Sequence, residues 1–83
     1  MPTIAVESRS LSDLALGESA EIAHLEGPPE IRMRLLEMGL TRGTAVRLVR
    51  AAPLGDPVEL AVRGYRLSVR KSEAASVMIE SVG

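Results

Sequence analysis

The fold is decided between Glu26 and Asp56, where the chain reads EGPPEIRMRLLEMGLTRGTAVRLVRAAPLGD. Pro29 suits the first turn of a helix, because a helix gives the N–H at that position no partner in any case. Apolar residues then recur at helical spacing at Ile31, Leu35 and Met38. Gly39 predicts a left-handed end to this helix, with Leu40 folding back as the hydrophobic contact of the cap. The stretch therefore predicts one short helix over 29–38, followed by a strand.

Alternation of apolar and polar residues predicts short strands around this helix. The expected strands cover 18–26, 44–52, 58–62 and 65–69, and a last strand holds Val77 and Ile79. Arg63-Gly64 predicts a tight hairpin turn between the third and fourth of these strands. Near the chain ends, Ser10 and Asp13 have the spacing of a capping box, and Ser72 is expected to cap a single helical turn.

These elements predict a mostly β protein. A small flat sheet would leave two exposed edges, and closure into a barrel removes them. We expect a small β-barrel of about five strands, with one short helix inserted after the first strand and single-turn helices near the ends. Residues 10–83 would form this one domain, and residues 1–9 an N-terminal tail.

The composition excludes several classes of function. The chain has 83 residues, no cysteine and a net charge of −1, and Tyr65 is its only aromatic residue. Without cysteine it has neither a disulfide nor a thiolate zinc site. A nucleic-acid-binding domain usually shows a basic excess and, for single strands, aromatic stacking platforms. No apolar run approaches the ~20 residues that cross a bilayer, and the N-terminus lacks the segments of a signal peptide. We expect a soluble cytoplasmic protein that binds no nucleic acid.

The sequence also lacks a catalytic arrangement. His24 is the only imidazole, and neither a Gly-x-Ser-x-Gly motif nor a Gly-x-x-x-x-Gly-Lys-[Ser/Thr] phosphate loop occurs. We therefore expect a binding module and not an enzyme.

Four motifs follow one another along the chain. They are Ser10-Leu11-x-x-Leu14-x-x-Gly17, Leu35-Leu36-x-Met38-Gly39-Leu40-x-x-Gly43, Ala52-Pro53-Leu54-Gly55-Asp56-Pro57 and Gly64-Tyr65-x-Leu67-x-Val69-Arg70-Lys71. Over residues 10–80 they resemble the ferrous iron transport protein A family, the FeoA domain. The resemblance implies an SH3-like barrel and a non-enzymatic cytoplasmic accessory of bacterial ferrous iron uptake. Its partner would be FeoB, the membrane transporter of Fe(II), which carries a cytosolic GTP-binding domain.

The resemblance leaves the mode of action open. Partner binding is expected, and modulation of GTP hydrolysis or of transport is a hypothesis. The alternative is a metal-responsive regulator, because a related barrel forms the C-terminal domain of iron-dependent repressors. No helix-turn-helix precedes residue 10, which favours a free-standing accessory. A homodimer also stays open, since small barrels with exposed strand edges often pair.

The helix supplies the first candidate partner-binding residues, which are Met33, Leu35, Leu36 and Met38. Two apolar stripes on so short a helix cannot both be buried, and an apolar remainder would mark an interface. The alternative interpretation places all of them in the core. The same helix contains Glu30 and Arg34 at the spacing of an i, i+4 ion pair.

Two further candidate contacts lie outside the helix. Leu54 stands at a loop tip, where binding residues often occur, and with the helix it could form one clamp. Its alternative is a rigid connection tucked over the barrel end. Arg66 and Arg70 belong to a basic strand face that could meet an acidic transporter surface. The alternative for these arginines is an ordinary solvated face.

His24 and Glu26 are the candidate metal ligands, because alternate strand residues share one side of a strand. Imidazole and carboxylate can bind Fe(II) or Zn(II), but stable sites usually have three or four protein ligands. We expect no required cofactor and, at most, a weakly bound divalent metal (Fe or Zn). A plain surface histidine is the alternative.

Overall fold

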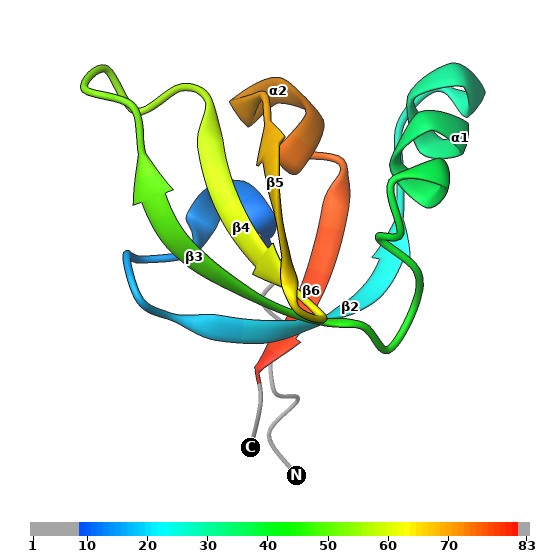
Figure 1. Cartoon of the computed structure of the whole chain (residues 1–83). Coiled ribbons are helices and arrows are strands. Elements are labelled where there is room, and N and C mark those ends of the chain that lie inside the picture. The colour runs from blue at the N-terminus through cyan, green and yellow to red at the C-terminus, as the bar shows by residue number, and fades with distance from the viewer. Residues whose placement is uncertain (1–8, 82–83) are drawn as a thin grey trace, which may run out of the picture.

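The computed structural model describes residues 9–81, in which six antiparallel strands form one sheet in the order β1-β6-β2-β3-β4-β5. The strands are β1 (Arg9–Ser10), β2 (Ser19–Leu25), β3 (Ala45–Ala51), β4 (Val58–Val62), β5 (Tyr65–Val69) and β6 (Val77–Ser81). The helices are the 3-10 helix η1 (Leu11–Asp13), α1 (Pro29–Glu37) and α2 (Lys71–Ala74). Figure 1 shows the sheet curling into a barrel, with α1 standing beside β2. The predicted mostly β barrel is confirmed.

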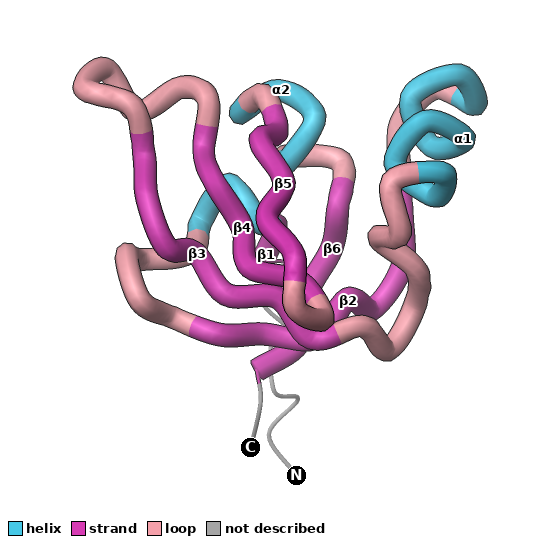
Figure 2. Tube along the Cα trace, in the orientation of Figure 1, coloured by secondary structure: helices cyan, strands magenta, loops and turns pink. Residues whose placement is uncertain are grey.

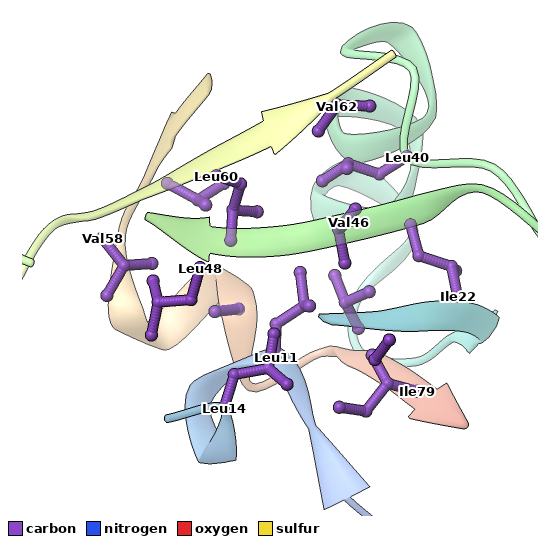
Figure 3. Close-up of a cluster of buried hydrophobic side chains, with 14 of the residues drawn as sticks. Leu11, Leu14, Ile22, Leu40, Val46, Leu48, Val58, Leu60, Val62 and Ile79 are labelled. Carbon is purple, nitrogen blue, oxygen red and sulfur yellow. The ribbon is translucent and has the colours of Figure 1, made fainter. Parts of the chain in front are cut away.

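The apolar residues of the strands face a single core, as their alternation predicted. On β4 the buried residues are Val58, Leu60 and Val62, and the residues between them are half-buried. Leu11 and Leu14 enter the same cluster from the chain before β2. Figure 3 shows these side chains meeting those of β2, β3 and β6. One contiguous cluster of this kind is what holds a small domain together.

The end of α1 is fixed by the glycine cap that the sequence predicted. Gly39 has a φ of +95°, the left-handed conformation that glycine adopts without a steric penalty. The Gly39 N–H donates to the Leu36 carbonyl at 3.0 Å, and the Leu40 N–H donates to the Leu35 carbonyl at 3.1 Å. These two bonds define a Schellman cap. Leu40 is fully buried, so the cap also anchors the segment after the helix in the core.

The hairpin between β4 and β5 also follows its local sequence. Arg63 and Gly64 have φ values of 41° and 88°, and Val62 pairs directly with Tyr65 across the turn. Two residues with positive φ form the type I′ turn, whose twist matches that of the strands. The predicted turn at Arg63-Gly64 is therefore confirmed.

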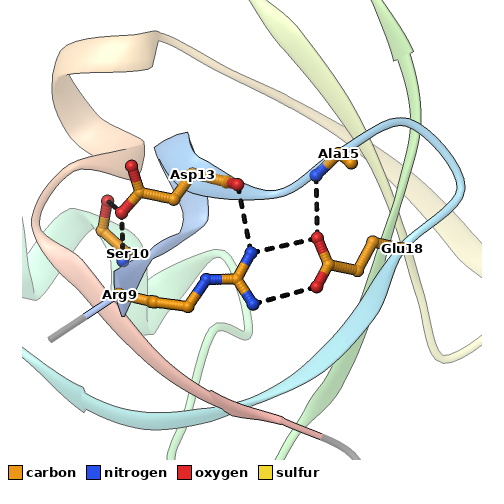
Figure 4. Close-up of polar contacts among 5 residues, drawn as sticks. All are labelled: Arg9, Ser10, Asp13, Ala15 and Glu18. Carbon is orange, nitrogen blue, oxygen red and sulfur yellow. Dashed lines mark hydrogen bonds and ion pairs between the residues drawn. The ribbon is translucent and has the colours of Figure 1, made fainter. Parts of the chain in front are cut away.

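The N-terminal segment is held by polar contacts (Figure 4). The Ser10 N–H donates to the Asp13 carboxylate at 2.9 Å and the Ser12 N–H donates to the Ser10 hydroxyl at 3.2 Å, which confirms the capping box. The Arg9 guanidinium donates to both carboxylate oxygens of Glu18, at 2.9 and 3.0 Å. This bidentate contact ties β1 to the chain that enters β2.

Hydrogen bonds to Glu18 hold its pKa low. The Arg9 side chain is the largest cause, and the Ala15 N–H, at 2.9 Å from Oε1, is the second. Together they lower the pKa of Glu18 from 4.5 to about 2, because each bond favours the charged carboxylate.

Three local predictions were wrong, and in two of them, at Arg9 and Arg34, a tertiary contact decided the outcome. Arg9, predicted to lie in the tail, belongs to β1, a strand that was not predicted, and pairs with Ile79 of β6. Residues 1–8 lie outside the described part. Ser72 is not the cap of α2, which begins at Lys71. Arg34 pairs with Glu73 of α2 at 2.5 Å and not with Glu30.

None of the helices in residues 9–81 has the length and the apolar sequence that a bilayer span requires.

Candidate partner-binding groove

The two apolar stripes of α1 differ in burial. The Leu35 side chain is 0% exposed, and Ile31 and Met38 are half-buried against the core. The neighbouring stripe is open, with Met33 63% and Leu36 48% exposed. Leu35, expected among the partner contacts, therefore belongs to the core, because the helix turns this stripe inward.

The open stripe of α1 forms one wall of a groove whose other wall is β2. The groove has a volume of about 590 Å³ and is lined by Ala23, His24, Leu25, Pro29, Arg32, Met33, Leu36 and Arg42. This volume lies within the range of small-ligand sites in proteins, roughly 300–1,000 Å³. Three sequence candidates, His24, Met33 and Leu36, meet here, and we call this feature the α1–β2 groove.

A bulge in β2 shapes the strand wall of the groove. Ile22 pairs with Ile79 of β6, but His24 pairs with Met78, so that Ala23 is an extra residue on β2. A bulge of this kind bends the strand and redirects its side chains. As a result, three consecutive residues, 23–25, line the groove, where a regular strand would contribute only alternate ones.

The turn after α1 places Arg42 at the groove. The Gly43 N–H donates to the Ile22 carbonyl at 2.7 Å, and the Ile22 N–H donates to the Thr44 carbonyl at 3.0 Å. The Thr44 side chain is buried, and its hydroxyl lies 2.9 Å from that of Thr41. These bonds hold the turn against β2, so the position of Arg42 is set by the backbone.

Two contacts seat α1 on the barrel beside its buried stripe. The Tyr65 hydroxyl on β5 donates to the Met38 carbonyl at 2.8 Å, and Arg34 pairs with Glu73 on α2 at 2.5 Å. Both contacts come from elements later in the chain, β5 and α2, and both meet the second half of α1 or its C-cap. The helical wall of the groove is therefore fixed by the fold and not only by local helix propensity.

The ionisable side chains that line the groove are two arginines and one histidine. Arg32 and Arg42 are its guanidinium groups, His24 is its imidazole, and no carboxylate lines it. Neither arginine forms an ion pair with any carboxylate of residues 9–81. For Arg32 the sequence gives a reason: the residues three and four positions away are two prolines and two leucines, so α1 offers it no acidic neighbour.

The candidate metal ligands lie at the edge of the groove. His24 Nε2 is 2.9 Å from Glu26 Oε2, and both side chains are exposed. In the described part of the chain no group of three or more His, Cys, Asp or Glu residues could hold a metal ion. The pair can therefore offer two ligands, fewer than stable zinc sites use.

The remaining candidates lie away from the groove. Leu54 is 96% exposed at the tip of the 53–57 loop, which Figure 2 shows on the opposite side of the molecule from α1. The helix and this loop therefore do not form one continuous clamp. Arg66 pairs with Glu59 at 3.3 Å, and Arg70 is exposed at the start of α2.

Sequence reasoning missed the part of the groove that depends on tertiary structure. The residues not predicted are Ala23, Leu25, Pro29, Arg32 and Arg42. Only Arg32 had a usable signal, which is its lack of an acidic partner on the helix. The other residues come to the groove through the bulge and the turn, which no local pattern marks.

The fold and the groove together define a small SH3-like β-barrel domain with an inserted helix and a cationic, apolar groove. Residues 9–81 match the model of the FeoA domain, and the chain therefore belongs to the FeoA family. It is 39% identical over 72 residues to an Fe(2+) transport protein A/Fe(2+) transporter FeoB fusion protein of Porphyromonas gingivalis. That match covers 87% of this chain and only 8% of the relative's length.

Solved FeoA structures have the same fold. The FeoA protein of Chlorobium tepidum is 36% identical with a TM-score of 0.83, and the match covers 90% of this chain and 71% of that one. A zinc complex of FeoA from Stenotrophomonas maltophilia, described as an SH3 domain protein, is 33% identical with a TM-score of 0.76. That match covers 87% of this chain and 89% of the other, and it confirms the SH3-like prediction.

The fold also occurs in regulators. A manganese-dependent transcriptional repressor is 15% identical with a TM-score of 0.82, over 98% of this chain and 44% of that one. At this identity the likeness shows a shared fold alone.

Proposed function

We propose that this chain is a non-enzymatic cytoplasmic accessory of ferrous iron uptake that binds the FeoB transporter. The observation that carries the proposal is the fusion protein, in which a domain 39% identical to this chain shares a polypeptide with FeoB. Such a link holds two domains at an effective concentration on the order of mM, so that even weak contacts are occupied. A domain that works beside FeoB in one protein supports the same partnership here.

We infer that the described part of the chain, residues 9–81, serves as a partner surface. Met33 and Leu36 present apolar area beside two guanidinium groups that have no ion pair within residues 9–81, a combination suited to protein contact. We therefore infer that this domain acts on GTP hydrolysis or on transport by binding, through a change in the population of FeoB states.

Met38, Leu54, Arg66 and Arg70 are secondary contacts in this proposal. Met38 is half-buried at the end of α1, next to the open stripe. Leu54 is the most exposed large apolar residue in residues 9–81, and a fully exposed leucine gains most from being covered. Arg66 and Arg70 would orient the partner by charge, which affects association rate more than affinity.

A divalent metal is a second, weaker ligand in this proposal. The zinc complex of the Stenotrophomonas FeoA supports metal affinity in the family, and His24 with Glu26 is the pair that would supply it here. With two exposed ligands, binding would be weak and completed by water.

The proposal is tested by the affinity of this chain for the purified cytosolic GTP-binding domain of its FeoB and for the full transporter in detergent. Both are measured with and without a GTP analogue, while GTP hydrolysis is followed. Binding that depends on nucleotide, or an altered hydrolysis rate, supports a regulatory subunit that acts through the GTP-binding domain. Binding to neither preparation overturns the proposal.

A further inference from the structure

We propose that the α1–β2 groove binds a short segment of the partner in which apolar side chains stand next to carboxylates. This inference rests on the proposed function and names the chemistry of the contact. The groove is lined by apolar atoms of Leu25, Met33 and Leu36, flanked by two guanidinium groups and without any carboxylate. Its occupant is therefore expected to bring both apolar surface and negative charge.

The arginines of the groove differ from those that the fold uses. Arg9, Arg34 and Arg66 each pair with a glutamate from another part of the chain. Arg32 and Arg42 have no such partner in residues 9–81, although both are held at the same groove by separate elements. The helix and the backbone-bonded turn set the backbone positions of these two arginines, and each guanidinium group can form a bidentate contact with a carboxylate.

The apolar lining favours a polypeptide over a phosphate ligand or a lipid surface. A phosphate site would gain nothing from Met33 and Leu36, which are 63% and 48% exposed. An anionic membrane is usually met by clusters of four to eight basic residues, roughly twice or more what the groove offers. The net charge of −1 gives no general attraction to such a surface either.

Methionine also suits a peptide groove, because its unbranched side chain adapts to the partner that covers it. Met33 lies one helical turn from Leu36 and Pro29, so these three side chains form one row along the groove. A row of this kind matches a segment that presents successive apolar side chains. Arg32 and Arg42 lie beside the row, where they would bind the carboxylates of that segment.

The test uses the FeoB preparations above and two matched pairs of variants. The combined Arg32→Glu and Arg42→Glu change is compared with the combined Arg47→Glu and Arg50→Glu change, which reverses the same number of charges at two exposed arginines of β3. These two lie outside the groove and have no ion pair in the described part. Leu36→Asp is compared with Leu16→Asp, since Leu16 is 70% exposed away from the groove. Circular dichroism and urea unfolding check that every variant folds.

We expect the double charge reversal and Leu36→Asp each to weaken FeoB binding by about tenfold or more, and the two controls by less than about twofold. Raised salt should weaken the wild type more than the double variant. Equal effects of groove and control variants overturn the groove as the site and leave the proposed function standing. Binding of the wild type to phosphatidylserine vesicles that needs Arg32 and Arg42, with FeoB binding unchanged, also overturns it. Absence of wild-type FeoB binding overturns the proposed function itself.

Discussion

Gly39→Ala should destabilise the protein through one identifiable contact. Gly39 has a φ of +95° at the end of α1, and a methyl group added there would overlap the Tyr65 hydroxyl. That hydroxyl donates to the Met38 carbonyl at 2.8 Å and joins β5 to the helix. The substitution therefore imposes both a left-handed conformation on alanine and the displacement of this hydrogen bond.

The size of the effect follows from the two parts. A left-handed conformation costs a residue with a Cβ roughly 1–2 kcal/mol, and a lost hydrogen bond costs about 0.5–1.5 kcal/mol. Gly39→Ala should therefore lower the free energy of unfolding by about 1.5–3.5 kcal/mol. Gly43 is the matched control, because its φ is +84° and an added Cβ would meet nothing within 4 Å. Gly43→Ala should cost only about 1–2 kcal/mol.

Urea unfolding followed by circular dichroism measures both changes, and Tyr65→Phe completes the design. Without the hydroxyl, the nearest ring carbon lies 3.6 Å from the added Cβ, an ordinary contact. In the Tyr65→Phe background, Gly39→Ala should cost no more than Gly43→Ala does in the wild type. The reasoning is refuted if Gly39→Ala costs the same in both backgrounds, or if it costs no more than Gly43→Ala.

Three further outcomes are expected. Leu35→Ala should lower the free energy of unfolding by about 2–5 kcal/mol, because it empties a core position. Leu36→Ala should change the free energy of unfolding by no more than about 0.5 kcal/mol. Similar urea midpoints for the two variants would contradict the assignment of Leu35 to the buried stripe and Leu36 to the open one. In an NMR pH titration Glu18 should titrate near its pKa of about 2, and Arg9→Gln should raise that pKa. Since the pKa of Glu18 in the folded protein lies below the ordinary 4.5, the stabilisation of the fold by the charged Glu18 is complete above about pH 4.5 and is lost as the pH falls towards 2. A Glu18 pKa near 4.5 in the wild type would contradict this role of the Arg9 contact. Zn(II) titration should show weak, reversible binding that His24→Ala abolishes, whereas tight stoichiometric binding that survives the substitution would show that the ligands lie elsewhere.

The fold could be predicted where local sequence determines backbone conformation. Pro29 and Gly39 bound the helix, Arg63-Gly64 forms the hairpin, and β4 shows its alternation without interruption. Each of these signals depends on a few neighbouring residues, so it survives in a single sequence. The barrel could be predicted from these elements, because a small sheet leaves unpaired backbone N–H and C=O groups at its edges and closure pairs them.

The rest depended on contacts between distant residues. The two residues of β1 are too few to show alternation, and their pairing with β6 decides their conformation. The bulge at Ala23 is visible only in the register between β2 and β6. Arg34 had Glu30 within reach on its own helix, but its ion-pair partner is the partly buried Glu73 of α2. Local preferences worth a few tenths of a kcal/mol are readily overridden in this way.

The candidate site could be predicted only in part, because local spacing marks its apolar residues and tertiary contacts decide which of them are exposed. Helical spacing identified two apolar stripes on α1, but it could not decide whether Leu35 or Leu36 faces the core. That choice depends on where the helix meets the barrel, which the Tyr65 contact and the buried Leu40 determine. Arg42 could not be assigned to the groove at all, since only the backbone bonds between its turn and β2 bring it there.

The measurement that tests the central claim most directly is a titration of the isotope-labelled chain with the cytosolic GTP-binding domain of its FeoB, followed by NMR through backbone amides. If the chain docks on FeoB through the α1–β2 groove, the shifted or broadened amides should concentrate at 23–25, at 32–36 and at Arg42, and the tip of the 53–57 loop should change little. Shifts that concentrate on β5 and around Arg70 would place the contact on the basic strand face. No change at any amide, with the full transporter equally without effect, would contradict FeoB binding.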